Sequence, residues 1–294
     1  MTTILMTGAT GYLGSRLSSH FLQNGYKIIA LCLNKTEKFR CGYKYEKNVK
    51  RYYLNKDSLC NIFNENKIDI VIHTATLYGR NNESVSKIIQ ANVLFPAEVL
   101  SEAIAGKVDL FINTDTVLNK NKNSYSLTKS HFADWLEIFC EKIKCVNIKL
   151  EHFYGPNDNP VKFVAWLIQQ FKKNADSIDL TDGLQKRDFI YIDDVVSAFD
   201  FIVKNKAQMV LGKINEFEAA SGCKISIREL AELIKEMMNN TKTKLNFGAI
   251  VDRKDEYLEI ESDTSELKKL GWQPKVSMKD GLAKILKIEK GKSK

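Results

Sequence analysis

The chain predicts an α/β fold: a doubly wound parallel sheet followed by a smaller mixed α/β lobe at the C-terminal side. Three observations predict it. Short apolar runs alternate with stretches of helical periodicity, and the runs lie at 3–7, 27–33, 68–73, 108–113 and 145–150. Strands that are apolar throughout are typical of a parallel sheet covered by helices on both faces. The alternation stops after Gly155-Pro156, where the lobe is expected to begin.

The first half begins with a strand at 3–7 that stops at a glycine. A helix at 13–22 follows and ends at Asn24-Gly25, and the next strand completes a βαβ unit. Three further helices are expected between the remaining strands, at 57–66, 84–105 and 125–142. We assign residues 1–155 to this first domain.

The second half has a less regular pattern. Residues 156–294 are expected to form mainly the lobe, while a segment near 190–220 returns to the first domain. The expected helices are 160–173, 192–203, 226–239 and a closing helix after Gly271-Trp272, and the expected strands are 178–180, 214–219 and 244–247.

Composition narrows the possible functions. The formal net charge is +8, but the lysines are spread along the chain among acidic residues, so we expect no nucleic-acid partner. We also expect no membrane span, because no apolar window approaches the necessary length, and no signal peptide at the N-terminus. The six cysteines include no C-x-x-C pair, which predicts reduced thiols, a cytoplasmic protein and no metal site.

A glycine-rich turn follows the first predicted strand. Gly8, Gly11 and Gly14 are spaced G-x-x-G-x-x-G directly before the first helix. Gly8 suits a tight turn, Gly11 lets the backbone approach a pyrophosphate, and Gly14 lets the helix pack close to the sheet. In this context the pattern predicts a Rossmann-type dinucleotide site, to which Thr10, Tyr12 and Leu13 also contribute.

The end of the second strand indicates which nicotinamide cofactor binds. No carboxylate follows the strand, where one would bind the ribose hydroxyls of NAD. Asn34 and Lys35 occupy this position instead, and Lys38 and Arg40 lie just beyond. This favours NADP(H) over NAD(H), although a solvated basic loop gives the same pattern.

Tyr125 and Lys129 lie four residues apart on one face of a predicted helix. The ammonium can lower the pKa of the phenol and reach a ribose hydroxyl, and the phenol can then exchange a proton with a substrate oxygen. Such a pair also arises by chance on solvated helices. Its position downstream of the glycine turn is therefore what makes it evidence for a catalytic site.

Taken together, these residues resemble the extended short-chain dehydrogenase/reductases, the NAD-dependent epimerase/dehydratase group, over essentially the whole chain. The segments that carry the resemblance are Thr7–Gly14, His73–Ala75, Asn92, Thr114, Tyr125 with Lys129, and Arg187–Asp194. The resemblance implies that Thr114 bonds the sugar carbonyl and that Arg187 and Arg253 grip a nucleotide diphosphate. It implies further cofactor contacts from Asp57, Thr74, Ala75, Asn92, Tyr125 and Lys129.

The segment Asn113–Val117 is similar to the motif of the family's sugar 4,6-dehydratases, but Thr116 stands where their catalytic glutamate would be. The sugar 4-ketoreductases of the family carry the same Thr-Asp pair without the glutamate. Lys149 to Pro156 departs from the usual Arg-x-x-Asn-x-Tyr-Gly-Pro pattern. This segment is similar to the enzymes of the family that reduce CDP-linked 4-keto-3,6-dideoxyhexoses, which implies sugar contacts from Asp115, Thr116, His152 and Lys162.

The resemblance therefore implies an NADPH-dependent 4-ketoreductase of a CDP- or dTDP-linked 4-keto-(di)deoxy sugar, for surface polysaccharide. It also implies a homodimer, formed through the helices at 84–105 and 125–142. The nearest alternative is an epimerase of the same fold that retains NAD. A remote alternative is a non-catalytic protein that binds NADP(H).

Overall fold

The computed structural model of the chain describes residues 1–34, 48–251, 258–259 and 261–291. These residues form two compact units, and the chain passes between them more than once. The first unit comprises Met1–Leu150, Val196–Glu218 and Glu266–Trp272, and the second comprises Glu151–Val195, Ala219–Ser265 and Gln273–Lys294.

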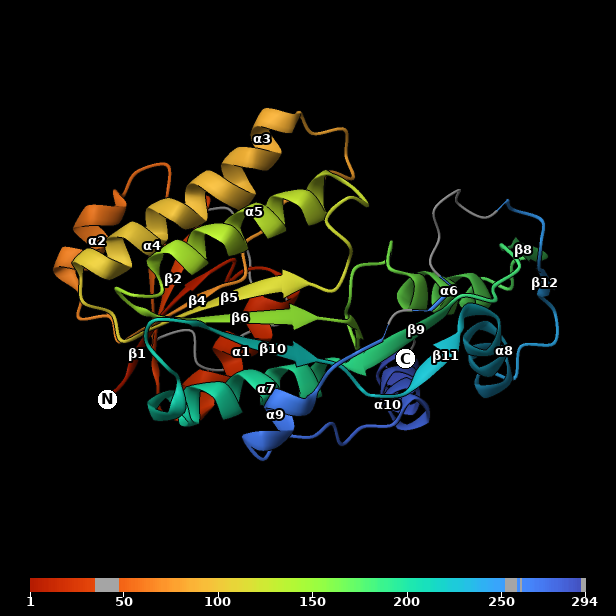
Figure 1. Cartoon of the computed structure of the whole chain (residues 1–294). Helices are drawn as coiled ribbons and strands as arrows, with labels where there is room; N and C mark the ends of the chain where they lie inside the picture. The colour runs from red at the N-terminus through yellow and green to blue at the C-terminus, as the bar shows by residue number, and fades with distance from the viewer. Residues whose placement is uncertain (35–47, 252–257, 260, 292–294) are drawn as a thin grey trace. The chain divides into compact units, whose positions relative to one another are not determined.

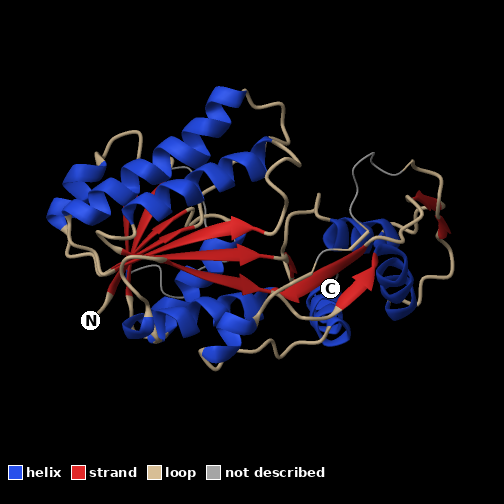
Figure 2. Cartoon of the chain, in the orientation of Figure 1, coloured by secondary structure: helices blue, strands red, loops and turns tan. Residues whose placement is uncertain are grey.

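A seven-stranded sheet forms the centre of the first unit (Figures 1 and 2). Its strand order is β10-β6-β5-β4-β1-β2-β3, and neighbouring strands from β6 to β3 in this order pair in parallel. The strands are β1 (Thr3–Thr7), β2 (Lys27–Cys32), β3 (Val49–Tyr53), β4 (Ile70–His73), β5 (Leu110–Thr116), β6 (Lys144–Leu150) and β10 (Ile214–Ala219). The order reverses between β1 and β4, which confirms the Rossmann-type doubly wound sheet and marks the place where such folds bind ligands.

Helices cover both faces of this sheet (Figure 1). On one face lie α1 (Tyr12–Gln23), α7 (Ile192–Lys204) and α9 (Ser265–Lys269). On the other lie α2 (Leu59–Glu65), α3 (Val85–Ile89), a π-helical segment η2 (Gln90–Leu94), α4 (Phe95–Ala105) and α5 (Ser124–Phe139). Phe111, Phe132 and Leu136 are fully buried in the core between α5 and the sheet. The apolar face of each helix therefore packs on strands that are apolar on both sides.

Two features of the sheet differ from the sequence prediction. Strand β3 was not predicted, because Val49–Tyr53 is polar and pairs only at the edge of the sheet, where Tyr52 alone is buried. Strand β5 continues to Thr116, three residues beyond the predicted end, and Thr114 to Thr116 pair with Ile148 to Leu150 of β6. The polar motif Asn113–Thr116 therefore belongs to a strand and not to the loop after it.

The long helix predicted at 84–105 is one helical segment interrupted by the π-helical turn η2. By length and composition alone, Val85–Ala105 would be long and apolar enough to cross a membrane, contrary to the expectation that no window approached this. One helix of this kind is weak evidence for a membrane span, because the core helices of soluble proteins can have the same length and composition. Here Val99, Leu100 and Ala103 are buried in the core against the sheet.

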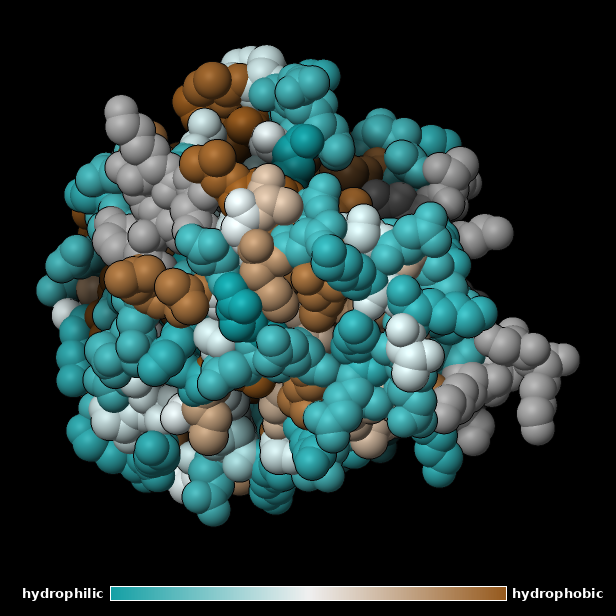
Figure 3. All heavy atoms as spheres, turned by 90° about the vertical axis from the view of Figure 1, so that its right-hand side faces the viewer, coloured by the Kyte–Doolittle hydropathy of each residue, from teal (hydrophilic) through white to brown (hydrophobic). Residues whose placement is uncertain are grey.

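The second unit is a mixed α/β assembly, as predicted for the lobe. A three-stranded sheet holds β7 (His152–Tyr154), β9 (Lys186–Tyr191) and β11 (Lys224–Ser226), and a two-stranded sheet holds β8 (Ser177–Asp179) and β12 (Lys244–Asn246). Its helices are α6 (Phe163–Lys172), α8 (Ile227–Met237) and α10 (Met278–Gly291). The side of the molecule drawn in Figure 3 has a mostly hydrophilic surface with small hydrophobic patches.

Strands β7, β9 and β11 and helix α9 were missed in the sequence. Three of the four are five residues or fewer, and β7 and β11 are defined by their pairing with β9 and not by a local pattern. The central strand β9 is buried from Arg187 to Tyr191 in spite of its charged beginning.

Candidate functional site

The glycine turn of the first unit has the geometry that its sequence predicts. Gly8 adopts φ = +64°, which an L side chain rarely does, and Gly11 N–H donates to the Gly8 carbonyl at 2.9 Å. A Cβ on Gly8 would lie 2.6 Å from the backbone nitrogen of Ala75, and a Cβ on Gly14 would collide with the Gly8 carbonyl. The turn, the first turn of α1 and the end of β4 therefore pack backbone against backbone.

The N-terminus of α1 has no side-chain cap. Its N-cap is Gly11, which has no side chain, whereas α5 begins with a capping box between Asn123 and Ser126. A Cβ on Gly11 would meet only the Gly8 carbonyl, at 3.1 Å. Residues 8–14 thus leave room beside the amide groups of a helix N-terminus, which favours an anion such as a pyrophosphate. The described residues fit a dinucleotide at this turn.

A buried hydrogen-bond network forms the floor beneath the turn. The Thr7 hydroxyl accepts the N–H groups of Thr74 and Ala75, both at 3.2 Å, so its own hydrogen points to Nδ1 of His73, 2.8 Å away. His73 is fully buried, and burial followed by the Lys129 charge lowers the pKa of its imidazole well below the usual value. His73 is therefore a neutral structural group, while Thr74 and Ala75 lie against the glycine turn as expected.

The residues predicted to distinguish NADP(H) from NAD(H) are described only in part. Asn34 is exposed just beyond β2, and Lys35, Lys38 and Arg40 lie outside the described residues. The Asp57 carboxylate accepts the Tyr53 N–H at 2.6 Å and closes the turn after β3. The carboxylate keeps further acceptor positions, so the cofactor contact expected of Asp57 stays a prediction.

Asn92 lies in the π-helical segment and is almost fully buried. Its Oδ1 accepts from the Leu77 N–H and the Thr76 hydroxyl, and its Nδ2 donates to the Leu77 carbonyl and the Thr128 hydroxyl. All four hydrogen-bonding positions of the amide are therefore used within the protein. Asn92 thereby ties the loop after β4 to α5, next to Lys129, and the cofactor contact expected of it stays a prediction.

Helix α5 presents Tyr125 and Lys129 at the carboxyl end of β5. Burial raises the pKa of the Tyr125 phenol, the nearby Tyr78 and Asp115 raise it further, and a hydrogen bond with the Thr116 side chain lowers it. Burial lowers the pKa of Lys129 to about 8, against an opposing effect of Asp115. The lowering of the phenol pKa by the Lys129 ammonium stays a prediction.

The hydroxyl and carboxyl groups at the end of β5 are close to this pair. Thr114 donates to the His73 carbonyl at 3.0 Å, so its hydrogen is engaged within the protein until the hydroxyl rotates. Asp115 accepts the Thr116 N–H at 2.7 Å and an amide hydrogen of Asn147 at 2.9 Å. The first unit thus brings together Thr114, Asp115, Thr116, Tyr125 and Lys129.

The remaining predicted residues belong to the second unit. His152 lies on β7, and its Nδ1 is 3.2 Å from the buried Glu151 carboxylate. Lys162 donates to the Phe153 carbonyl and forms an ion pair with Asp158 at 3.3 Å. Arg187 is buried on β9 and donates to the Lys186 carbonyl at 2.7 Å. His152 lies on β7 and Lys162 contacts the same strand at Phe153, while Arg253 lies outside the described residues.

Several polar residues near these sites were not singled out in the sequence. Tyr78 packs its ring 4.9 Å from that of Tyr125, and Asn113 and Asn147 lie beneath Lys129. Glu151 orients His152 and accepts the Ser262 hydroxyl at 3.0 Å. The signal that could have revealed Asn147 is a single amide inside the otherwise apolar run Cys145–Ile148.

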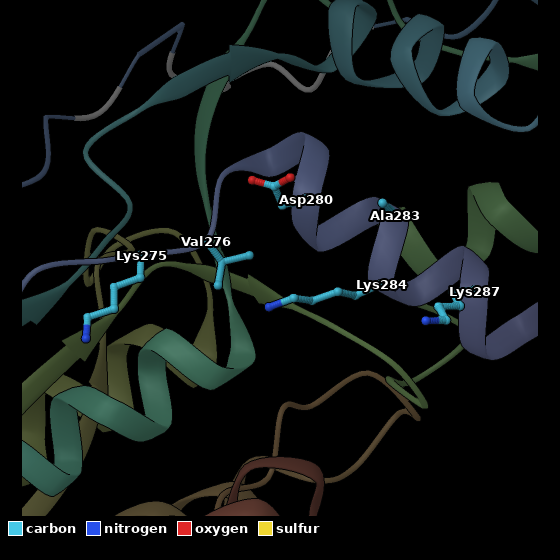
Figure 4. A pocket seen from close by; sticks show the side chains of 6 residues that line it. All are labelled: Lys275, Val276, Asp280, Ala283, Lys284 and Lys287. Carbon is cyan, nitrogen blue, oxygen red and sulfur yellow. The ribbon is translucent and has the colours of Figure 1, made fainter.

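The second unit also contains a cavity of about 400 Å³ before and along α10 (Figure 4). Its lining combines three lysines with one carboxylate, and the residues are Lys275, Val276, Asp280, Ala283, Lys284 and Lys287. None of the predicted substrate-binding residues lines it. Among the described residues, no group of three or more His, Cys, Asp or Glu side chains could hold a metal ion.

Comparison with known proteins identifies relatives of the whole chain. Residues 4–215 match the profile of the NAD dependent epimerase/dehydratase family. CDP-abequose synthase of Salmonella muenchen is 36% identical over 296 residues, covering 97% of each chain. CDP-abequose synthase of Salmonella typhimurium is 30% identical over 297 residues, with the same coverage.

Solved structures with the same fold include two epimerases. UDP-glucose 4-epimerase of Thermotoga maritima, solved with UDP-glucose, has a TM-score of 0.84 at 22% identity and covers 100% of both chains. UDP-glucuronic acid 4-epimerase of Bacillus cereus, solved with UDP-glucuronic acid and NAD, has a TM-score of 0.82 at 21% identity and covers 98% of this chain and 100% of its own. At these identities the likeness concerns the fold alone.

Proposed function

Because the chain belongs to the NAD-dependent epimerase/dehydratase family, we propose that it is a 4-ketoreductase of a nucleotide-linked 4-keto-(di)deoxy sugar. The observation that carries the proposal is Thr116. A hydroxyl stands where the 4,6-dehydratases of the family would have a glutamate. It accepts the Leu118 N–H at 3.2 Å and makes a hydrogen bond with the Tyr125 phenol. A threonine hydroxyl cannot act as the base for elimination near neutral pH without an activator.

The proposed substrate is CDP- or dTDP-linked, and the proposed use is the synthesis of surface polysaccharide. The similarity to two CDP-abequose synthases supports the proposed substrate, because each of them matches 97% of this chain. Within the second unit, we propose that Arg187 and Arg253 bind the diphosphate, and that His152 and Lys162 contribute to the nucleotide-sugar site. Bidentate recognition of phosphate suits an arginine.

The proposed cofactor is NADPH. When bound, it supplies the two electrons and the hydrogen that reduce the ketone at C4. The turn at Gly8–Gly14 holds its pyrophosphate, with Thr74 and Ala75 beneath it, while Asn34, Lys35 and the basic residues after them accommodate the additional phosphate. We retain Thr10, Tyr12 and Leu13 as backbone contacts at the same turn.

The residues of the first unit then have distinct tasks. Tyr125 donates the proton to the oxygen at C4, and the phenol, whose pKa burial raises, is in its protonated form at neutral pH, as the reductive direction requires. Lys129 provides a positive charge next to the cofactor ribose. Thr114 orients the carbonyl after its hydroxyl turns away from His73, and Asp115 and Thr116 contact the sugar.

The second candidate is an NAD-dependent epimerase of the same fold, because the matched family includes epimerases as well as dehydratases. An epimerase uses the same phenol in both directions and regenerates its NAD in every turnover. A non-catalytic dinucleotide-binding protein is a more remote candidate, and the assembled set of Thr114, Tyr125 and Lys129 argues against it.

We further propose a cytoplasmic homodimer that associates through α3–α4 and α5. The cysteines of the described residues are all free thiols, as suits a reducing compartment. The two adjacent helices expose large apolar side chains: Val85, Ile89, Leu94, Leu127, Trp135 and Ile138. Such side chains are typical of an interface between copies of a chain.

The experiment that tests the function is an assay of 4-keto sugar nucleotides with different bases. We expect NADPH to be oxidised with a CDP- or dTDP-linked 4-keto-6-deoxy or 4-keto-3,6-dideoxy sugar, and more efficiently than NADH. Purified protein that carries stoichiometric NAD, or that prefers NADH clearly, would support the epimerase instead.

A further inference from the structure

Two asparagine side chains lie buried on neighbouring strands of the sheet of the first unit. Asn113 of β5 and Asn147 of β6 occupy paired positions, and both are 0% exposed. Their neighbours Ile112, Val146 and Ile148 are apolar and equally buried. Two buried amides destabilise a sheet unless each finds hydrogen-bond partners, so the pair needs an explanation.

The two amides connect a carboxylate to an ammonium. Asn113 Nδ2 donates to Asn147 Oδ1 at 2.8 Å, and Asn147 Nδ2 donates to Asp115 Oδ2 at 2.9 Å. At the other end, the Lys129 ammonium contacts Asn113 Oδ1 at 3.5 Å. The chain of contacts therefore runs from Asp115 through Asn147 and Asn113 to Lys129.

The two charged groups fix the direction of this chain. An ionised carboxylate can only accept hydrogen bonds, and an ammonium can only donate them. Both amides accordingly turn their nitrogen toward Asp115 and their oxygen toward Lys129. If Asn113 flipped, its NH₂ group would face the ammonium, donor against donor.

We propose that Asn147 is a positioning residue for the catalytic lysine: it holds the Asn113 amide so that its oxygen faces the Lys129 ammonium. The contact of 3.5 Å is long for a hydrogen bond, so the orientation of the amide dipole matters more than the bond itself. The inference rests on the role proposed above for Lys129.

The oriented amide stabilises a charge that burial opposes. Burial lowers the pKa of Lys129 to about 8, and the Asp115 carboxylate raises it. The other titratable groups around it are His73 of β4, which is neutral, and Tyr125, one turn away on α5. Without the Asn147 amide, only the long contact of 3.5 Å with the ammonium itself orients Asn113. The amide is then no longer held in place, and the pKa of Lys129 falls further.

Two substitutions of Asn147 separate the effect of its hydrogen bonds on Asn113 from the effect of its size. Asn147→Leu has a similar size but cannot hydrogen-bond. Asn147→Asp preserves the pattern, because a carboxyl group that shares a proton with Asp115 can still accept from Asn113. Cys145→Ala is the matched control, since Cys145 is buried on the same face of β6, two residues away.

The primary measurement is an NMR pH titration of ¹³C-labelled lysine in the protein without cofactor or substrate, with Lys129→Met identifying the signal. We expect Asn147→Leu to lower the pKa of Lys129 by about half a unit or more. Asn147→Asp should leave it at or above the wild-type value, and Cys145→Ala should not change it. In the kcat profile, the loss of activity on the alkaline side should begin at lower pH for Asn147→Leu.

An unchanged pKa of Lys129 in folded Asn147→Leu would overturn the proposal. If that variant does not fold, Asn147→Ser takes its place with the same expected decrease, because its short hydroxyl side chain ends before Asn113. A lowered pKa together with no turnover of any 4-keto sugar nucleotide by the wild type would overturn the proposed function and leave the positioning role in place.

Discussion

Burial acts on Tyr125 and Lys129 in opposite directions, because it disfavours the charged form of each side chain. The pKa of the phenol rises and that of the ammonium falls to about 8. Near neutral pH the phenol is therefore protonated, and most of the lysine is still charged. This pair of states suits a group that gives a proton to a newly formed alkoxide.

The first prediction concerns the Tyr125 hydroxyl. Tyr125→Phe removes the proton donor and keeps the ring that packs on Tyr78. Turnover should fall by about 10²–10⁴-fold, the usual contribution of a positioned acid, while cofactor affinity should remain nearly unchanged. Steady-state kinetics and a fluorescence titration with NADPH measure the two quantities. Retention of most of the activity would mean that the proton comes from another group.

The second prediction concerns the stability effect of Lys129. Its folded-state pKa of about 8 lies below the ordinary 10.5, so the folded protein binds fewer protons than the unfolded chain between these values. The unfavourable contribution of the buried ammonium is full below about pH 8 and disappears as the pH rises through 10.5. At pH 7 it amounts to roughly 3 kcal/mol.

Lys129→Met should therefore unfold at higher urea concentration than the wild type at pH 7, with a gap that narrows toward pH 10, and it should lose turnover and cofactor affinity. Lys142→Met, at an exposed lysine beyond α5, is the control and should have little effect on stability. A Lys129→Met protein that is less stable than the wild type at pH 7 would contradict this account.

At the scale of elements, two glycines in the connection from β1 to α1 are required for different reasons, one for packing and one for the ligand. Gly14 is required by packing, because a Cβ would overlap the Gly8 carbonyl and lie 2.9 Å from the Thr74 hydroxyl. Gly11 has only one neighbour near its Cβ position, the Gly8 oxygen at 3.1 Å. The requirement for glycine at position 11 should therefore come from the ligand.

This distinction gives the third prediction. Gly14→Ala should destabilise the protein by about 1–3 kcal/mol and abolish dinucleotide binding. Gly11→Ala should leave the melting temperature nearly unchanged but weaken NADPH binding by tenfold or more. Gly25→Ala, at a glycine with positive φ and open surroundings, should affect stability alone. Equal losses of stability in Gly11→Ala and Gly14→Ala would contradict the claim that packing requires Gly14 and the ligand requires Gly11.

Some elements of the fold could be predicted from the sequence and others could not. Strands β1, β2, β4 and β6 could be predicted because each contains a mainly apolar run, and the glycine turn because its spacing has a physical purpose. Strands β3, β7 and β11 could not, because their pairing partners define them. The role of Asn92 in fastening a loop to α5 could not be predicted either, because its partners Leu77 and Thr128 are distant in sequence.

At the scale of the whole molecule, the two units divide the proposed tasks. The first unit combines the dinucleotide turn with Thr114, Tyr125 and Lys129, and the second contains His152, Lys162 and Arg187. The central claim is that these residues perform a net reduction. A reductase needs one proton and one equivalent of reduced cofactor per product, whereas a dehydratase needs an acid and a base at C5 and C6, and an epimerase recovers its cofactor.

The most direct test is the stoichiometry of the reaction together with the mass of the product. With a CDP- or dTDP-linked 4-keto-6-deoxy or 4-keto-3,6-dideoxy sugar, we expect one NADPH to be consumed per sugar and the product to gain two hydrogens. CDP-glucose and dTDP-glucose should remain unchanged. A product lighter by one water, or an isomer of unchanged mass, formed without net consumption of NADPH would contradict the account.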